Sequence, residues 1–407
     1  ATKTLLKDVI KWVKFSGIAW QADGFYYSAY DAPVAGKEFS NKNEYHKIYF
    51  HKVGDAQTAD KLVFENKKFP LRNCGAAVTD DEKYLVISET ESTSGNSLHI
   101  KDLSKPNAPL VTLEAGFEND YNVVDHVNGK LYVLTNWKAS NQQLMEVDPA
   151  KPARENWKTI LPETENVLEG VSILGGKIVA EYLQDASNHV YTYDFTGKKL
   201  AEVALPAIGT VSGFSGDKDD NEAFYTFTSF TFPPTIYRYD VAQNKSEVFR
   251  KTEVNFNPED YVSEQQFYTS KDGTKVPMFI TYKKGMQKTG KNPLLLYGYG
   301  GFNISVNPGF SVARIPFIEN GGIYVIANIR GGGEYGEAWH KAGTKMQKQN
   351  VFDDFISAAE YLIAKKYTSK SKVAFCNHRR YSRHATYQSL GHHGRHDQEL
   401  PSRSEER

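Results

Sequence analysis

The sequence predicts two kinds of structure in series, an incomplete β-propeller of about five blades followed by part of an α/β domain with a parallel sheet. Two observations support this fold class. Two short apolar runs within residues 293–336 end in glycine-rich turns, as strands buried on both faces of a parallel sheet do. A strand-like pattern that ends in aspartate recurs every 46 residues, at Asp102, Asp148, Asp194 and Asp240.

The repeat is an alternating apolar or aromatic run that closes on aspartate before a polar turn. Val190–Asp194 and Ile236–Asp240 show it clearly, and Ile48–Lys52 is a weaker fifth copy. A period near 46 residues with about four short strands per unit is typical of propeller blades. An irregular β-sandwich is the alternative, but a sandwich has no reason to keep a constant period. We therefore predict about five blades in residues 1–256, with aromatic side chains such as Tyr239 in their cores.

The composition excludes several classes of function. The chain carries 49 basic and 49 acidic side chains, with no basic stripe that would indicate nucleic acid. No apolar run approaches the roughly 18 residues that a membrane helix needs, and no signal-peptide core is present. We therefore expect no nucleic-acid partner, no membrane attachment and a cytoplasmic or periplasmic location. We expect no metal or other cofactor, because the histidines of the repeats lack metal-ligand spacing: His46, His51, His99, His126 and His189.

Residues 257–376 are predicted to form the α/β part. Asp272-Gly273, between two strand-like runs, indicates a hairpin. Apolar residues near i, i+4 spacing predict an amphipathic helix over 350–363 with Asn350 as a possible N-cap, and a further strand begins at Lys372. This order of strand, helix and strand is that of a parallel sheet.

Two glycine loops are the expected place for chemistry. The apolar run 294–297 breaks into Gly298–Phe302, and the run 323–329 breaks into Arg330–Gly336. Ligands of open α/β sheets bind in the loops at the carboxyl ends of the strands. Both loops leave their strands at that end, so we expect them to lie together.

These loops also carry a family resemblance. The segments Tyr297–Phe302 (YGYGGF), Ala327–Gly336 (ANIRGGGEYG) and Asp353–Phe355 (DDF) resemble the prolyl oligopeptidase (prolyl endopeptidase) family. That family consists of serine peptidases in which a seven-bladed β-propeller caps an α/β-hydrolase domain. The resemblance covers about residues 1–376. It implies a monomer that hydrolyses short proline-containing peptides on the carboxyl side of proline. It also implies that the chain begins part-way through the propeller.

The resemblance implies roles for individual residues. Tyr299 corresponds to the tyrosine that donates its hydroxyl to the oxyanion of the tetrahedral intermediate, and Phe302 to an aromatic residue lining the proline pocket. A donor placed where negative charge develops is worth about 3–4 kcal/mol of barrier. We expect Arg330 and Glu334 to pair with each other and hold their loop, rather than to touch substrate.

The resemblance stops where the nucleophile is expected. An α/β-hydrolase carries its serine on a sharp G-x-S-x-G turn after a strand, here near Arg379. The sequence at this point has neither serine nor flanking glycine. Residues 377–407 contain six arginines and no lysine, and no Val, Ile, Phe or Met. We interpret this switch as a changed reading frame followed by early termination, and expect an irregular tail outside the family over 377–407.

Two functional hypotheses follow. In the first, the chain is a fragment of a serine endopeptidase of this family, inactive because the Ser, Asp and His of the triad are absent. In the second, it is a non-catalytic propeller that serves as a peptide-binding or interaction module. A complete ring of blades would favour the second hypothesis, and about five copies argue against it.

Overall fold

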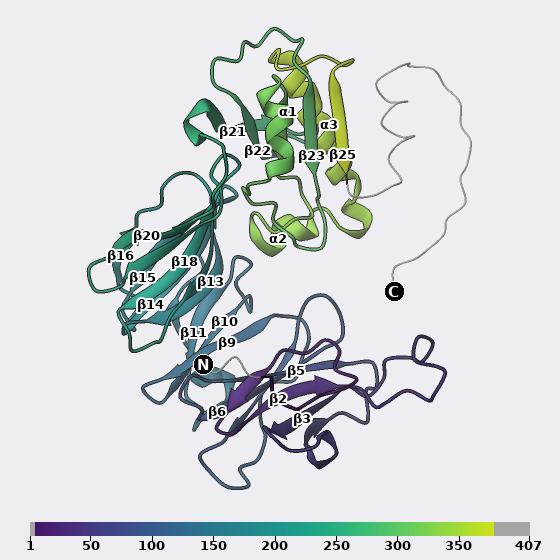
Figure 1. Ribbon diagram of the computed structural model, residues 1–407, viewed down its shortest axis with the longest axis vertical. Coiled ribbons are helices and arrows are strands. Elements are labelled where there is room, and N and C mark those ends of the chain that lie inside the picture. The colour runs from purple at the N-terminus through teal and green to yellow at the C-terminus, as the bar shows by residue number, and fades with distance from the viewer. Residues whose placement is uncertain (1–4, 378–407) are drawn as a thin grey trace.

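The computed structural model describes residues 5–377, so the predicted irregular tail lies outside the described residues except for Asn377. Five four-stranded antiparallel sheets come first, and a five-stranded mixed sheet with helices follows. The blades succeed one another along an arc, and the α/β part lies above the last of them (Figure 1). The predicted fold class is confirmed.

Each blade is a simple meander of four strands in chain order. The first contains β1 (Ala19–Gln21), β2 (Gly24–Ala29), β3 (Lys47–Lys52) and β4 (Lys61–Glu65). The second contains β5 (Asn73–Val78), β6 (Tyr84–Thr90), β7 (Ser97–Asp102) and β8 (Val111–Glu114). The third contains β9 (Tyr121–Val127), β10 (Lys130–Thr135), β11 (Gln143–Val147) and β12 (Lys158–Leu161). The fourth contains β13 (Val167–Leu174), β14 (Lys177–Gln184), β15 (Ser187–Tyr193) and β16 (Lys199–Val203). The fifth contains β17 (Thr210–Ser215), β18 (Glu222–Thr228), β19 (Thr235–Asp240) and β20 (Lys245–Lys251).

The repeating aspartates explain why the period is kept. Asp102, Asp148 and Asp194 each accept a hydrogen bond from the backbone N–H two residues later, at 3.0, 2.9 and 2.8 Å. Asp240 accepts from Gln243 N at 2.8 Å. An aspartate that bonds its own backbone in this way stabilises a tight turn. The aspartates therefore fix the turn between the third and fourth strands of blades two to five.

Neighbouring blades share apolar cores. One core joins the second and third blades, and another joins the fourth and fifth. Tyr225 and Tyr239 are 1% and 0% exposed in the latter, as predicted for aromatic strand residues. Burying a large apolar side chain contributes about 1.5–3 kcal/mol. Each blade is thus held mainly by the faces it presents to its neighbours.

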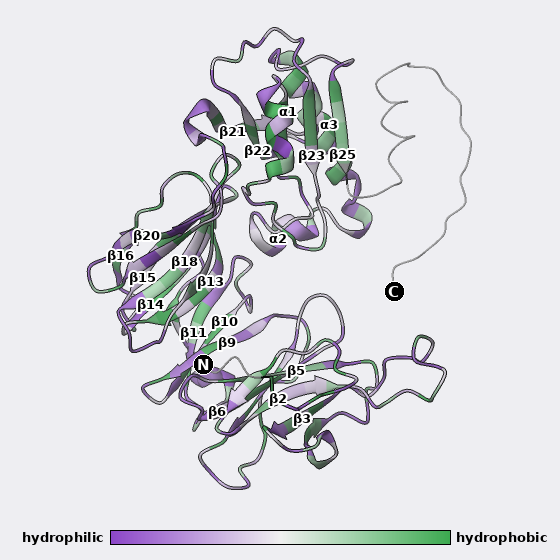
Figure 2. Ribbon diagram, in the orientation of Figure 1, coloured by the Kyte–Doolittle hydropathy of each residue, from purple (hydrophilic) through white to green (hydrophobic). Residues whose placement is uncertain are grey.

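The α/β part is a mixed sheet in the order β21-β22-β24-β23-β25. The hairpin of β21 (Tyr261–Thr269) and β22 (Lys275–Lys283) turns at Asp272-Gly273, as predicted. The strands β23 (Leu294–Gly298), β24 (Ile323–Ala327) and β25 (Val373–Asn377) are mutually parallel. Every residue of β24 is buried, and apolar residues dominate β23 and β25 (Figure 2).

Within residues 5–377, three α-helices accompany the sheet: α1 (Ile315–Glu319), α2 (Gly336–Lys341) and α3 (Gln349–Ala364). The described part of the chain also has short 3-10 turns at Gln57–Ala59, Arg154–Asn156, Pro258–Asp260, Val312–Arg314 and Lys345–Gln347. The prediction that Asn350 caps α3 is wrong. The turn at Lys345–Gln347 runs into the helix, so Asn350 lies inside it and donates Nδ2 to Ala342 O at 2.9 Å.

The two parts of the molecule share a core. Phe230, from the fifth blade, packs against Phe279 of β22 with ring centroids 5.4 Å apart. Tyr335, just before α2, donates its hydroxyl to Asp185 of the fourth blade at 2.7 Å. Thr210, on β17, donates its hydroxyl to Pro308 O at 2.7 Å. The glycine loops of the sheet therefore lie against the propeller.

Candidate active-site loops

The two glycine loops meet at the carboxyl ends of β23 and β24, as expected. The backbone N–H of Asn303 donates to Gly331 O at 3.2 Å, which ties the first loop to the second. Lys348 donates Nζ to Gly300 O at 2.8 Å and ties the first loop to the start of α3. The loops therefore form one unit, joined by a backbone hydrogen bond and by the Lys348 side chain.

Glycine is required where the loops touch. Gly300 has a φ of +59°, and a Cβ there would lie 2.6 Å from Val351 Cγ1 and 2.8 Å from Arg330 O. Gly331 has a φ of +95°, and a Cβ there would lie 2.6 Å from Gly300 O. Side chains rarely adopt this left-handed backbone, and neither position has room for one. The close approach of the two loops therefore requires glycine at both positions.

Arg330 anchors the second loop, but its partner differs from the prediction. Its guanidinium bonds Asp354 through Nε at 2.9 Å and Nη2 at 2.6 Å, and Asp272 through Nη1 at 2.6 Å. Asp354 is fully buried on α3 and also accepts the hydroxyl of Ser270 at 2.5 Å. A hydrogen bond to Arg330 holds the pKa of Asp272 well below its usual range. Arg330 thus joins the loop, α3 and the β21–β22 hairpin.

Glu334 holds the loops in a different way. The predicted Arg330–Glu334 pair is wrong, because Glu334 Oε1 accepts hydrogen bonds from Val306 N at 3.0 Å and Asn328 Nδ2 at 3.2 Å. Asn328 Nδ2 also donates to Val306 O at 2.8 Å. Both the N–H and the C=O of Val306 are therefore hydrogen-bonded, and Glu334 and Asn328 together clamp its backbone. Sequence reasoning missed Val306 and Asn328, and no local spacing signals this contact.

The two predicted site residues lie on the first loop. Tyr299 follows β23 directly and is half-buried. Phe302 is 58% exposed and has a φ of +55°, an uncommon backbone for an aromatic residue. An exposed apolar ring on a fixed backbone suits contact with an apolar ligand. The predicted elbow position near Arg379 lies outside the described residues.

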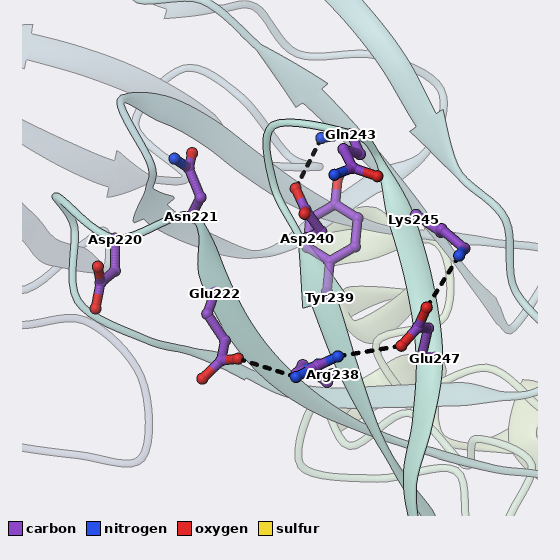
Figure 3. Close-up of a pocket in the computed structure, with 9 residues that line it drawn as sticks. All are labelled: Asp220, Asn221, Glu222, Arg238, Tyr239, Asp240, Gln243, Lys245 and Glu247. Carbon is purple, nitrogen blue, oxygen red and sulfur yellow. Dashed lines mark hydrogen bonds and ion pairs between the residues drawn. The ribbon is translucent and has the colours of Figure 1, made fainter.

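A cavity of about 490 Å³ lies elsewhere, at one end of the fifth blade. Figure 3 shows four of its charged side chains in a row of ion pairs. Arg238 pairs with Glu222 at 3.6 Å and with Glu247 at 3.1 Å. Lys245 pairs with Glu247 at 2.9 Å. Because its two basic side chains are already paired with carboxylates, this cavity is a weaker candidate for ligand binding than the glycine loops.

Within residues 5–377, no group of three His, Cys, Asp or Glu side chains is arranged to hold a metal ion. In the same part of the chain, no helix has both the length and the apolar character needed to cross a membrane.

A propeller joined to a sheet whose glycine loops face it defines a class, the α/β-hydrolases with a propeller cap. Residues 1–252 match the family model for the N-terminal β-propeller domain of prolyl oligopeptidase, and residues 308–376 match that of the prolyl oligopeptidase family. The chain belongs to the prolyl oligopeptidase family.

Individual relatives agree. The prolyl endopeptidase of Elizabethkingia meningoseptica is 50% identical over 92% of this chain and 53% of that protein. The prolyl endopeptidase of Dictyostelium discoideum is 37% identical over 91% of this chain and 52% of that protein. The chain thus spans about half the length of the curated relatives it matches.

Solved structures give the same result. Prolyl oligopeptidase B from Galerina marginata, bound to a 35mer hydrolysis and macrocyclization substrate, superposes with a TM-score of 0.86 at 33% identity. That match covers 91% of this chain and 53% of the other. A prolyl endopeptidase structure gives a TM-score of 0.84 at 40% identity, covering 90% of this chain and 54% of the other.

Proposed function

We propose that this chain is the propeller and first catalytic portion of a prolyl oligopeptidase-family endopeptidase, and that it does not itself cleave peptides. The whole protein would hydrolyse short peptides after proline. In it Tyr299 would donate to the oxyanion, and Phe302 would contact the substrate proline. The observation that carries the proposal is the interlocked pair of glycine loops, which presents both side chains beside the carboxyl end of β23.

The lack of activity follows from chemistry rather than from the fold. Peptide hydrolysis by acyl transfer needs a nucleophile and a base that activates it. The oxyanion donor only stabilises the tetrahedral intermediate that they form. From the last residue of β25 onward the sequence reads Asn377-His378-Arg379, without a serine. Loss of the nucleophile alone costs a serine protease on the order of a million-fold in turnover.

A chromogenic Gly-Pro substrate tests the proposal. We expect no turnover by the purified chain, while the prolyl endopeptidase of Elizabethkingia meningoseptica, assayed beside it, releases product. Turnover by the chain that a serine-directed organophosphate blocks would contradict the proposal. Turnover that the organophosphate leaves unchanged would indicate a contaminating or unrelated activity, and repeating the assay with Tyr299→Phe would separate these cases.

The remaining proposals concern organisation and partners. We assign the propeller to residues 1–256, the catalytic portion to 257–376 and a tail outside the family to 377–407. The proposed ligands are short proline-containing peptides. The proposed state is a monomer in the cytoplasm or periplasm, without a cofactor, nucleic acid or membrane partner. The equal numbers of basic and acidic side chains support the absence of nucleic acid. Light scattering should give a mass near 45.9 kDa.

A further inference from the structure

The segment 302–308 lies between the sheet and the propeller. At one side, Glu334 and Asn328 clamp the backbone of Val306. At the other, Pro308 O accepts the hydroxyl of Thr210 from the fifth blade. Because Phe302 begins this segment, whatever fixes Val306 also limits where the exposed ring can lie.

Glu334 is an unusual residue for such a clamp. Its side chain is 1% exposed, and its Oε2 has no hydrogen-bond partner among the described residues. No cation forms an ion pair with it within residues 5–377. A buried carboxylate without a cation or a full set of donors is costly, so the proton-bound form is favoured. Burial raises the pKa of Glu334 to about 7, although the hydrogen bonds from Val306 and Asn328 lower it.

The charges that face Glu334 add to this cost. From the propeller, Glu169 on β13 raises the pKa of Glu334 further. Glu169 is itself exposed on β13, and it accepts Asn188 Nδ2 at 2.8 Å. Beside it, burial and the Glu169 charge raise the pKa of Glu181 to about 7. On its own loop, the Arg330 charge is already engaged by Asp354 and Asp272. No described cation offsets an ionised Glu334.

We propose that Glu334 is a positioning residue of the substrate pocket, a proton-bound latch that holds residues 302–308 between the sheet and the propeller. Loss of the proton to solvent leaves an uncompensated charge beside Glu169. Opening of the segment then lets water reach the carboxylate. The latch rests on the proposed function in one respect, since the pocket it positions is the one containing Phe302.

The direction of the pH dependence follows from linkage. The carboxyl binds its proton more tightly in the closed segment than in an open one, where its pKa returns toward 4.5. The closed form is therefore most stable at acid pH. The opening constant should rise by up to about tenfold per pH unit between about 4.5 and about 7, and level off above that range.

Amide hydrogen exchange of the purified chain tests the latch without any need for catalysis. Protection of residues 302–308 is measured from pH 5 to 8 and corrected for the intrinsic pH dependence of exchange. The wild-type chain should lose protection as pH rises and then level off. Glu334→Gln keeps an oxygen that accepts from Val306 but cannot ionise, so its corrected protection should stay flat near the acid level of the wild type. In Glu169→Gln the loss of protection should level off at a lower pH, because the charge of Glu169 no longer raises the pKa of Glu334.

Two controls keep the result interpretable. Glu337→Gln removes a nearby carboxyl that pairs with Lys341 instead of the loop, and it should follow the wild type. Exchange in β14, within the fourth blade, reports whether a variant is folded. A flat wild-type profile, or a Glu334→Gln profile that retains the slope in a folded chain, overturns the latch. A chain that cleaves peptides would overturn the proposed function and leave this measurement unaffected.

Discussion

Tyr299 stands one residue beyond the end of β23, beside the loop contact between Asn303 and Gly331. Its proposed role can be tested in a chimera in which the Elizabethkingia meningoseptica enzyme supplies the regions this chain does not cover. We expect Tyr299→Phe to lower kcat/KM roughly tenfold to a thousandfold, because a donor used in the transition state affects rate more than binding. Steady-state kinetics on a Gly-Pro substrate measure it.

Phe302→Ala in the same chimera is the matched control. An apolar contact is shared by the ground and transition states, so this change should mainly raise KM and leave kcat nearly unchanged. If Tyr299→Phe left kcat/KM unchanged, the tyrosine would serve only to pack the loop.

At the level of single residues, motifs located the loops but not all of their contacts. Tyr299 and Phe302 could be assigned to the first loop because both belong to the YGYGGF segment that resembles the family and that follows an apolar run. The partner of Arg330 could not, since Asp354 lies on a helix 24 residues further along the chain. One signal was available: Asp354 is a lone acid among the apolar positions of the predicted helix, which suggests a buried charge in need of a partner.

At the level of the elements, Arg330 and Asp354 help to hold the second glycine loop, α3 and the β21–β22 hairpin together. Loss of their contact should therefore lower the stability of the fold. Asp354→Asn leaves the guanidinium buried with only Asp272 as a charged partner. We expect the free energy of unfolding to fall by about 3–5 kcal/mol, as for other broken buried pairs. Urea unfolding measures it.

The control is an exposed pair on the neighbouring helix. Lys341 is 71% exposed and lies 3.2 Å from Glu337, so Glu337→Gln should cost at most about 1 kcal/mol. An equal loss in both variants would show that the buried pair contributes no more than a surface one.

The first blade carries a pH-dependent contact of its own. His51 is fully buried and bonds Asp60 at 2.7 Å and Asp8 at 3.2 Å. Burial lowers the pKa of His51, but the two carboxylates outweigh it and raise the pKa above 6.5. The stabilisation is therefore complete below about 6.5 and is lost as pH rises through the raised pKa.

His51→Gln should reveal this dependence. The Tm difference between wild type and variant should be largest at acid pH and should shrink as pH rises past 6.5. Thermal unfolding from pH 5.5 to 8.5 measures it, and taking the difference removes the other titrating groups. A difference independent of pH would mean that the imidazole contributes packing alone.

Hairpins and strands could be predicted because turn residues and alternation act locally. The helix α3 was predicted to within one residue at each end, but its N-cap was not, because a 3-10 turn runs into the helix and Asn350 bonds backward to Ala342. That choice depends on the path of the preceding residues, which no capping pattern encodes.

For the whole molecule, Phe230 tests how firmly the sheet and the propeller are joined. It is 4% exposed and packs against Phe279 and Tyr324 across the junction. We expect Phe230→Ala to cost about 3–5 kcal/mol and to separate the unfolding of the two parts. Calorimetry would show two transitions in place of one.

Phe249→Ala provides the comparison on the same blade. Phe249 is 62% exposed on β20, so its removal should shift neither transition appreciably. The sequence predicted both parts of the molecule, but not this junction, because no local pattern around Phe230 shows that its partners are Phe279 and Tyr324, far along the chain.

The bonds from Thr210 to Pro308 and from Phe310 to Thr228 span 98 and 82 residues. Each blade, by contrast, pairs strands that are neighbours along the chain. Contacts between distant residues form slowly, because the chain between them must first be brought to order. During synthesis, blades can thus assemble as they leave the ribosome, and the segment with Phe302 settles only after the fifth blade is complete. A nascent chain would form its blades before the segment that carries Phe302 takes its final position.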